Sequence, residues 1–88
     1  MNRIRQIIEE IRELEKEPTH RSSLRIYSLL ENNSKLFLEK MDADDFKHQH
    51  SAFEALIDKS PVEYGTAVYK EEFQRRYQAL AFYLNRII

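Results

Sequence analysis

The sequence contains no cysteine and only one glycine, Gly65, and these absences exclude several classes of protein. Without cysteine the chain cannot form a disulfide framework, a zinc ribbon or a thiol nucleophile. A single glycine cannot build the glycine-rich loop that cradles a phosphate or a dinucleotide. No apolar run approaches about 18 residues, so we expect no membrane-spanning helix. The first 17 residues alternate charged side chains with isoleucine, so we expect no signal peptide.

The residues that are present indicate one small helical domain over residues 1–88. Of these 88 residues, 42% are apolar and 33% are charged, which is typical of a globular chain rather than a disordered one. Only two prolines accompany the glycine, which is too little turn chemistry for a β-sandwich or barrel. The formal net charge is −1 with histidine neutral. The lack of cysteine fits a cytoplasmic location, which we therefore expect.

The spacing of the apolar residues predicts four helices, at about residues 2–17, 20–41, 43–59 and 61–88. The second is expected to be continuous, because its apolar stripe keeps its phase along the whole segment. Its weak point is Asn32-Asn33-Ser34, where a break would give two shorter helices with Ser34 capping the second. Helices of these lengths with short connections favour a compact antiparallel four-helix bundle.

Helix-start signals support the last two of these helices. Asp42 is the expected N-cap of the third. In Ser60-Pro61-Val62-Glu63 a serine at the N-cap, a proline at the first helical position and a glutamate at N3 form a capping box. The fourth helix is therefore predicted to start at Pro61, and Gly65 is the point at which it would kink.

One face of each expected helix is apolar and is predicted to form the core. These faces consist of Met1, Ile4, Ile7, Ile8, Ile11 and Leu14; Ile26, Tyr27, Leu30, Phe37, Leu38 and Met41; Ala43, Phe46, His50, Phe53, Leu56 and Ile57; and Tyr69, Phe73, Tyr77, Leu80, Leu84 and Ile87. Ser23 lies on the stripe of the second helix, where a small side chain allows close approach of a neighbour.

The last helix carries more apolar residues than one core face needs. The stretch from Ala79 to Leu84 is apolar all round, and Phe82 points about 180° away from Phe73. A bundle covers one side of each helix, so we expect Phe82 to be exposed in a single copy and to anchor an interface. The alternatives are a helix buried on every side, or a singly exposed phenylalanine. The predicted interface consists of Tyr64, Val68, Arg75, Gln78, Phe82, Arg86 and Ile88.

Metal binding and catalysis find little support in the sequence. Three aspartates and two histidines lie between Asp42 and His50, but His48 and His50 would point about 160° apart on a helix. Only Asp44 and His48 could share an ion, and two ligands are too few unless two copies meet at the site. No serine or histidine has a neighbour that would activate it. We therefore expect no metal, no cofactor and no enzymatic activity.

The remaining classes of function are binding functions. We expect a non-enzymatic protein-interaction module, such as a regulator, inhibitor or adaptor, that contacts a protein partner or forms a homodimer. In size, acidity and helical pattern the chain resembles small bacterial regulators, phage-encoded inhibitors and bacteriocin immunity proteins, although it contains no motif of theirs. Nucleic-acid binding is the other alternative, and the net charge of −1 argues against it. It would use the basic residues of the second and fourth helices: His20, Arg21, Arg25, Lys35, Lys40, Lys70, Arg75, Arg76 and Arg86.

Overall fold

The computed structural model describes residues 3–58 and 66–87, and within these ranges the chain is an all-α bundle without strands. The described helices are α1 (Arg3–Leu14), α2 (His20–Asn32), α3 (Ser34–Leu38), α4 (Ala43–Ile57) and α5 (Ala67–Ile87). The predicted all-α class is confirmed. The predicted number of helices is wrong, because the described residues form five helices rather than four.

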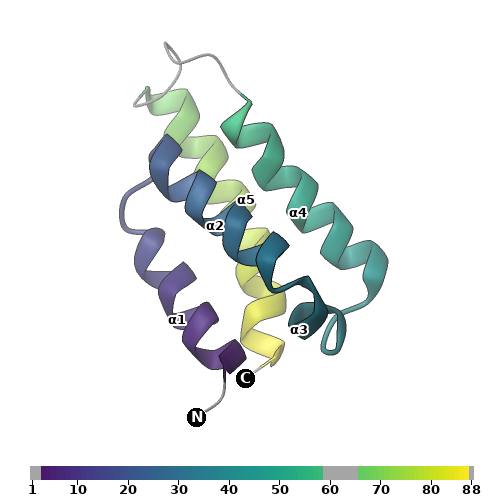
Figure 1. The fold of residues 1–88 in the computed structure, drawn as a ribbon. Helices are drawn as coiled ribbons and strands as arrows, with labels where there is room; N and C mark the ends of the chain where they lie inside the picture. The colour runs from purple at the N-terminus through teal and green to yellow at the C-terminus, as the bar shows by residue number, and fades with distance from the viewer. Residues whose placement is uncertain (1–2, 59–65, 88) are drawn as a thin grey trace.

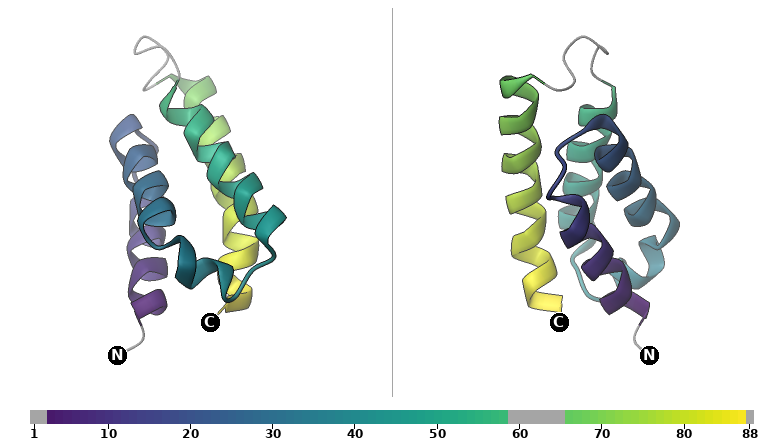
Figure 2. Two further views of the ribbon diagram at one scale, coloured as in Figure 1. Left: turned by 45° about the vertical axis from the view of Figure 1, so that its right-hand side comes forward. Right: turned by 90° about the vertical axis from the view of Figure 1, so that its left-hand side faces the viewer.

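The four longer helices pack around one core, and the most extensive helix–helix contact is between α2 and α4. In the left view of Figure 2, α1 lies beside α2 and α4 beside α5, with the short α3 crossing between the two sides. Along the chain, α1, α2, α4 and α5 run alternately up and down in Figure 1, so that the start of α1 and the end of α5 lie at the same end of the bundle. The side chains of Arg12 and Asn85 join these two helices, with 2.8 Å between Nη2 and Oδ1.

Side-chain caps fix the starts of three helices. Thr19 Oγ1 accepts the Ser22 N–H at the start of α2. Asp42 caps α4 as predicted, since its Oδ1 accepts the Asp44 N–H at 2.8 Å. Thr66 Oγ1 accepts the Tyr69 N–H at the start of α5. The helix start predicted at Pro61 and the kink predicted at Gly65 lie outside the described residues.

The predicted continuous helix over residues 20–41 is wrong, because the chain breaks at Asn33. The Asn33 backbone has φ −122° and ψ 26°, outside the helical region. Its side-chain amide donates to the Leu29 carbonyl at 2.9 Å, the acceptor that the main-chain N–H of residue 33 would use in a regular helix. The alternative of two shorter helices is therefore correct, although Asn33 rather than Ser34 precedes the second.

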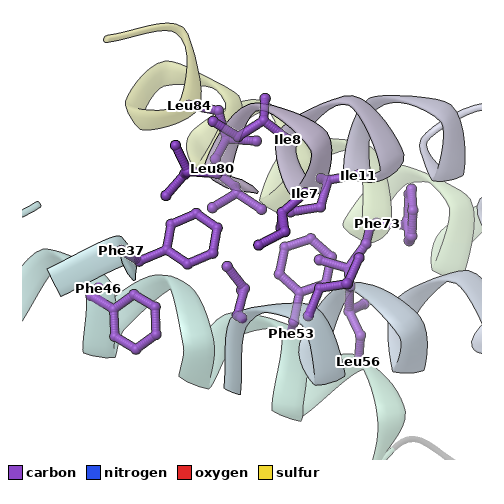
Figure 3. Close-up of a cluster of buried hydrophobic side chains, with 14 of the residues drawn as sticks. Ile7, Ile8, Ile11, Phe37, Phe46, Phe53, Leu56, Phe73, Leu80 and Leu84 are labelled. Atoms are coloured by element: carbon purple, nitrogen blue, oxygen red, sulfur yellow. The ribbon is translucent and has the colours of Figure 1, made fainter. Parts of the chain in front are cut away.

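All five helices contribute to one apolar core. Figure 3 shows isoleucines of α1 facing leucines of α5, with phenylalanines of α3 and α4 packed beside them. The predicted faces are mostly confirmed, but Leu38 is 44% exposed because α3 no longer continues the stripe of α2. Ala43 is also exposed, because it lies in the first turn of α4. The buried apolar residues are Ile4, Ile7, Ile8, Ile11, Ile26, Leu29, Leu30, Phe37, Phe46, Phe53, Leu56, Tyr69, Phe73, Leu80 and Leu84.

Candidate interaction surface

The residues predicted to form an interface lie together on the side of α5 that faces away from the core. Five of the seven belong to the described ranges, and all five are exposed. We call them the outer α5 face: Val68, Arg75, Gln78, Phe82 and Arg86. Tyr64 and Ile88 lie outside the described residues. The structure thus places these side chains in solvent, and their role as an interface stays a prediction.

Phe82 is the large apolar side chain at the centre of this prediction. It is 56% exposed, so it does not belong to the core of a single copy. The Arg86 guanidinium lies over its ring, with Cζ 5.4 Å from the ring centroid, within the range of a cation–π interaction. The Tyr83 ring meets it edge-on at 5.3 Å between centroids. Two neighbours therefore restrict the orientation of a ring that solvent still reaches.

Val68 is also exposed, at 68%, but it does not extend the apolar patch around Phe82. The two residues are fourteen positions apart, which is about 21 Å along a helix at 1.5 Å per residue. Arg75 and Gln78 lie between them. The apolar part of the outer α5 face is therefore local to Phe82 and the last turns of α5.

Tyr83 connects this end of α5 to the start of α4. Burial raises the pKa of Tyr83, and the charge and hydrogen bond of the Asp45 carboxylate raise it further. Both side chains line a cavity of about 310 Å³ with Lys40, Met41, Asp42, Arg86 and Ile87. The acidic first turn of α4 thus lies close to the aromatic and basic end of α5.

A second cavity, of about 410 Å³, lies between α4 and α5, and we call it the α4–α5 pocket. Its lining residues are His48, Gln49, Ser51, Ala52, Arg75, Arg76 and Ala79. Gln49 is 4% exposed, and its Oε1 has no hydrogen-bond partner among the described residues. Arg76 Nη1 is also buried and has no hydrogen-bond partner in that part of the chain. The same atom forms an ion pair with Glu72 Oε1 at 3.6 Å.

The pocket was not predicted from the sequence, although the sequence contains one signal of it. Gln49 lies three residues after Phe46 and four before Phe53, which both belong to the predicted core face. A polar side chain at that spacing must be buried, and a buried amide needs hydrogen-bond partners. The arginines opposite it could not be placed without knowing how α4 and α5 pack.

A third cavity, of about 650 Å³, lies between α1 and α2. An ion pair crosses it, with 2.6 Å between Arg25 Nε and Glu10 Oε2, and the hydrogen bond and charge of Glu10 raise the pKa of Arg25. The charges around it are of both signs, so this cavity favours no ligand of one charge. It is lined by Glu10, Leu14, Glu17, Arg21, Ser22, Leu24, Arg25 and Ser28.

The residues considered for metal binding are spread apart. Within residues 3–58 and 66–87, no three His, Asp or Glu side chains come together as metal ligands would. His48 lines the α4–α5 pocket. His50 instead stacks on Tyr27, with ring centroids 4.5 Å apart, and on Phe46 at 6.0 Å. His50 is thus part of an aromatic stack at the edge of the core.

Across the described residues, no helix combines the length and the apolar character needed to cross a membrane. Searches against protein-family models, curated proteins and solved structures found no match to this chain. The all-α bundle and its surface are therefore the basis for inferring a function.

Proposed function

We propose that this chain is a small, non-enzymatic protein-interaction module that acts in the cytoplasm and docks through the outer α5 face. The proposal is carried by Phe82, which is 56% exposed beneath the Arg86 guanidinium. Aromatic and arginine side chains are enriched among the residues that dominate binding energy in protein interfaces. A second copy of the chain is the first partner to test, because homodimers are the commonest assemblies of soluble proteins.

The energetics of docking favour Phe82 as the anchor. Complete burial of an exposed phenylalanine side chain contributes about 1.5–3 kcal/mol. Arg86 already restricts the ring, so less conformational entropy is lost when a partner covers it. Arg75 and Gln78 are exposed beside it and would supply the polar rim of such an interface.

The experiment is light scattering coupled to size-exclusion chromatography over a wide range of protein concentrations. We expect the wild-type mass to approach twice that of one chain as the concentration rises. Phe82→Ala should weaken the association by about 2 kcal/mol or more, as truncation of an interface anchor does. The helical circular dichroism spectrum should be unchanged.

Leu24→Ala is the matched control, because Leu24 is 44% exposed on α2 and its truncation should leave the association constant unchanged. A single-chain mass at every concentration would exclude the second copy as the partner. If Leu24→Ala weakened the association as much as Phe82→Ala, the outer α5 face would not be the interface.

A further inference from the structure

The α4–α5 pocket contains polar groups whose hydrogen bonds are not made within the described chain. Gln49 Oε1 is a buried acceptor and Arg76 Nη1 is a buried donor, and neither has a hydrogen-bond partner among the described residues, although Arg76 Nη1 lies 3.6 Å from Glu72 Oε1 in an ion pair. Leaving such a group unsatisfied costs about 1–3 kcal/mol, and more where the group is charged. A ligand that offers both an acceptor for the arginine and a donor for the amide would recover this free energy.

We propose that the α4–α5 pocket binds a carboxylate with a neighbouring amide N–H, as presented by a protein segment. The carboxylate accepts hydrogen bonds from Arg76 and Arg75, and the N–H donates to Gln49 Oε1. Arginine and carboxylate form paired, charge-assisted hydrogen bonds that are stronger than those between neutral groups. The small side chains of Ala52 and Ala79, which line the same pocket, leave room for the ligand backbone.

The charge of the pocket favours a carboxylate over a phosphate. Glu72 lies 3.6 Å from Arg76, so its negative charge offsets one of the two arginines. The charges of Arg75, Arg76 and Glu72 together leave one net positive charge, which matches a monoanion. A phosphate monoester carries a charge of about −1.5 to −2 at neutral pH and would leave negative charge uncompensated.

The pocket adjoins the proposed interface. Arg75 belongs both to the pocket lining and to the outer α5 face, and Ala79 lies one helical turn before Phe82. A docked protein could therefore cover Phe82 and place a carboxylate in the pocket at the same time. The inference rests on the proposed function for the source of the carboxylate, but binding of a small carboxylate probe does not require association.

The test is an NMR titration of the ¹⁵N-labelled protein at constant ionic strength. The first probe is N-acetylglycine, which has a carboxylate and an amide N–H in the arrangement of a chain terminus. N-acetylaspartic acid amide presents the carboxylate from a side chain instead. Whichever of the two binds more tightly identifies a terminal or a side-chain carboxylate as the natural ligand, and either result supports the site.

Three further probes separate the parts of the recognition. Acetate lacks the amide N–H and should bind about threefold or more weakly than N-acetylglycine, as expected for the loss of one neutral hydrogen bond. N-acetylglycinamide lacks the charge and should cause no shifts in the pocket. Inorganic phosphate should bind no more tightly than acetate. For the probes that bind, the shifts should be confined to the residues that line the pocket.

Variants assign the binding to these side chains. Arg76→Gln should weaken N-acetylglycine binding about tenfold or more, the effect of losing a charge-assisted hydrogen bond. If the spectrum of Arg76→Gln shows that this variant does not fold, Arg75→Gln, at an exposed position, is used instead. It also removes one positive charge from the pocket and should weaken binding. Lys47→Gln is the matched control, because it removes one positive charge from an exposed position of α4 outside the pocket. Phe82→Ala should retain probe binding, which separates this inference from the association itself.

Several results would overturn the inference. These are the absence of saturable shifts with either carboxylate probe, shifts scattered over the basic surface, tighter binding of phosphate than of N-acetylglycine, and equal effects of Arg76→Gln and Lys47→Gln. Any of them would mean that Gln49 and Arg76 do not recognise a carboxylate in this pocket.

Discussion

The hydroxyl groups of Tyr69 on α5 and Ser23 on α2 form a buried hydrogen bond, with 2.8 Å between the two oxygen atoms. Each hydroxyl also has a main-chain acceptor, because Ser23 Oγ lies 3.0 Å from the Thr19 carbonyl oxygen and the Tyr69 hydroxyl lies 3.5 Å from the Leu56 carbonyl oxygen. Both residues are at most 1% exposed. Because Ser23 and Tyr69 are 46 positions apart in the sequence, this bond ties together two distant segments of the chain inside the core.

Replacing Tyr69 with phenylalanine should lower the free energy of unfolding by about 1 kcal/mol, because a buried hydrogen bond is lost without a large change in packing. Urea denaturation followed by circular dichroism measures this loss. Tyr27→Phe is the matched control, since its hydroxyl donates to Glu54 at 3.2 Å on an exposed surface. Its loss should stay within about 0.5 kcal/mol. Equal losses in the two variants would contradict a special role for the buried bond.

The core could be predicted where the pattern is local and uninterrupted. In α1 the isoleucine spacing alone identifies the buried face, and Ile4, Ile7, Ile8 and Ile11 are all buried as predicted. A regular helix fixes the direction of each side chain, so the sequence period is sufficient there. The same is true of Phe73, Leu80 and Leu84 in α5.

The break at Asn33 could not be decided from the sequence. A continuous helix and a broken one both satisfy the apolar stripe, and the choice depends on whether the next segment packs better after a change of direction. The structure favours the break, which buries Phe37 and exposes Leu38. The low helix propensity of Asn32-Asn33-Ser34 shows where the helix would break, and tertiary packing decides that the break occurs.

For the surface, the sequence predicted single residues but not pockets. The exposure of Phe82 follows from its angle to Phe73 on one helix. The α4–α5 pocket depends on how two helices pack, so the position of Gln49 and Arg76 in one pocket could be seen only in the fold. The sequence shows which residues are charged, but only the fold shows which charged side chains lie next to one another.

Phe73 and Phe82 provide a direct comparison on one helix, because Phe73 is fully buried against Phe53, with ring centroids 6.2 Å apart. Phe73→Ala should cost about 3–5 kcal/mol of stability through the cavity that it leaves. Phe82→Ala should change the stability of the single chain by no more than about 0.5 kcal/mol. Chemical denaturation at the lowest practical concentration compares them without a contribution from association. A large loss for Phe82→Ala would show that its ring supports the fold.

Alkaline pH should destabilise the protein through its tyrosines. Burial raises the pKa of Tyr77 above its ordinary value of 10.0, the charge of Glu15 raises it further, and Arg12 opposes them.

Below pH 10 this tyrosine is neutral in both the folded and the unfolded chain, so its contribution to stability is fully present. As pH rises above about 10 the unfolded chain loses its proton first. The free energy of unfolding should therefore fall until the pKa of folded Tyr77 is passed. Urea denaturation at about pH 8 and about pH 11 measures this loss. This loss in the free energy of unfolding should be smaller in Tyr77→Phe. A part of the loss should remain, because the pKa values of Tyr27 and Tyr83 are also raised. An identical pH dependence in the variant and the wild type would show that Tyr77 ionises equally easily in the folded and unfolded chain.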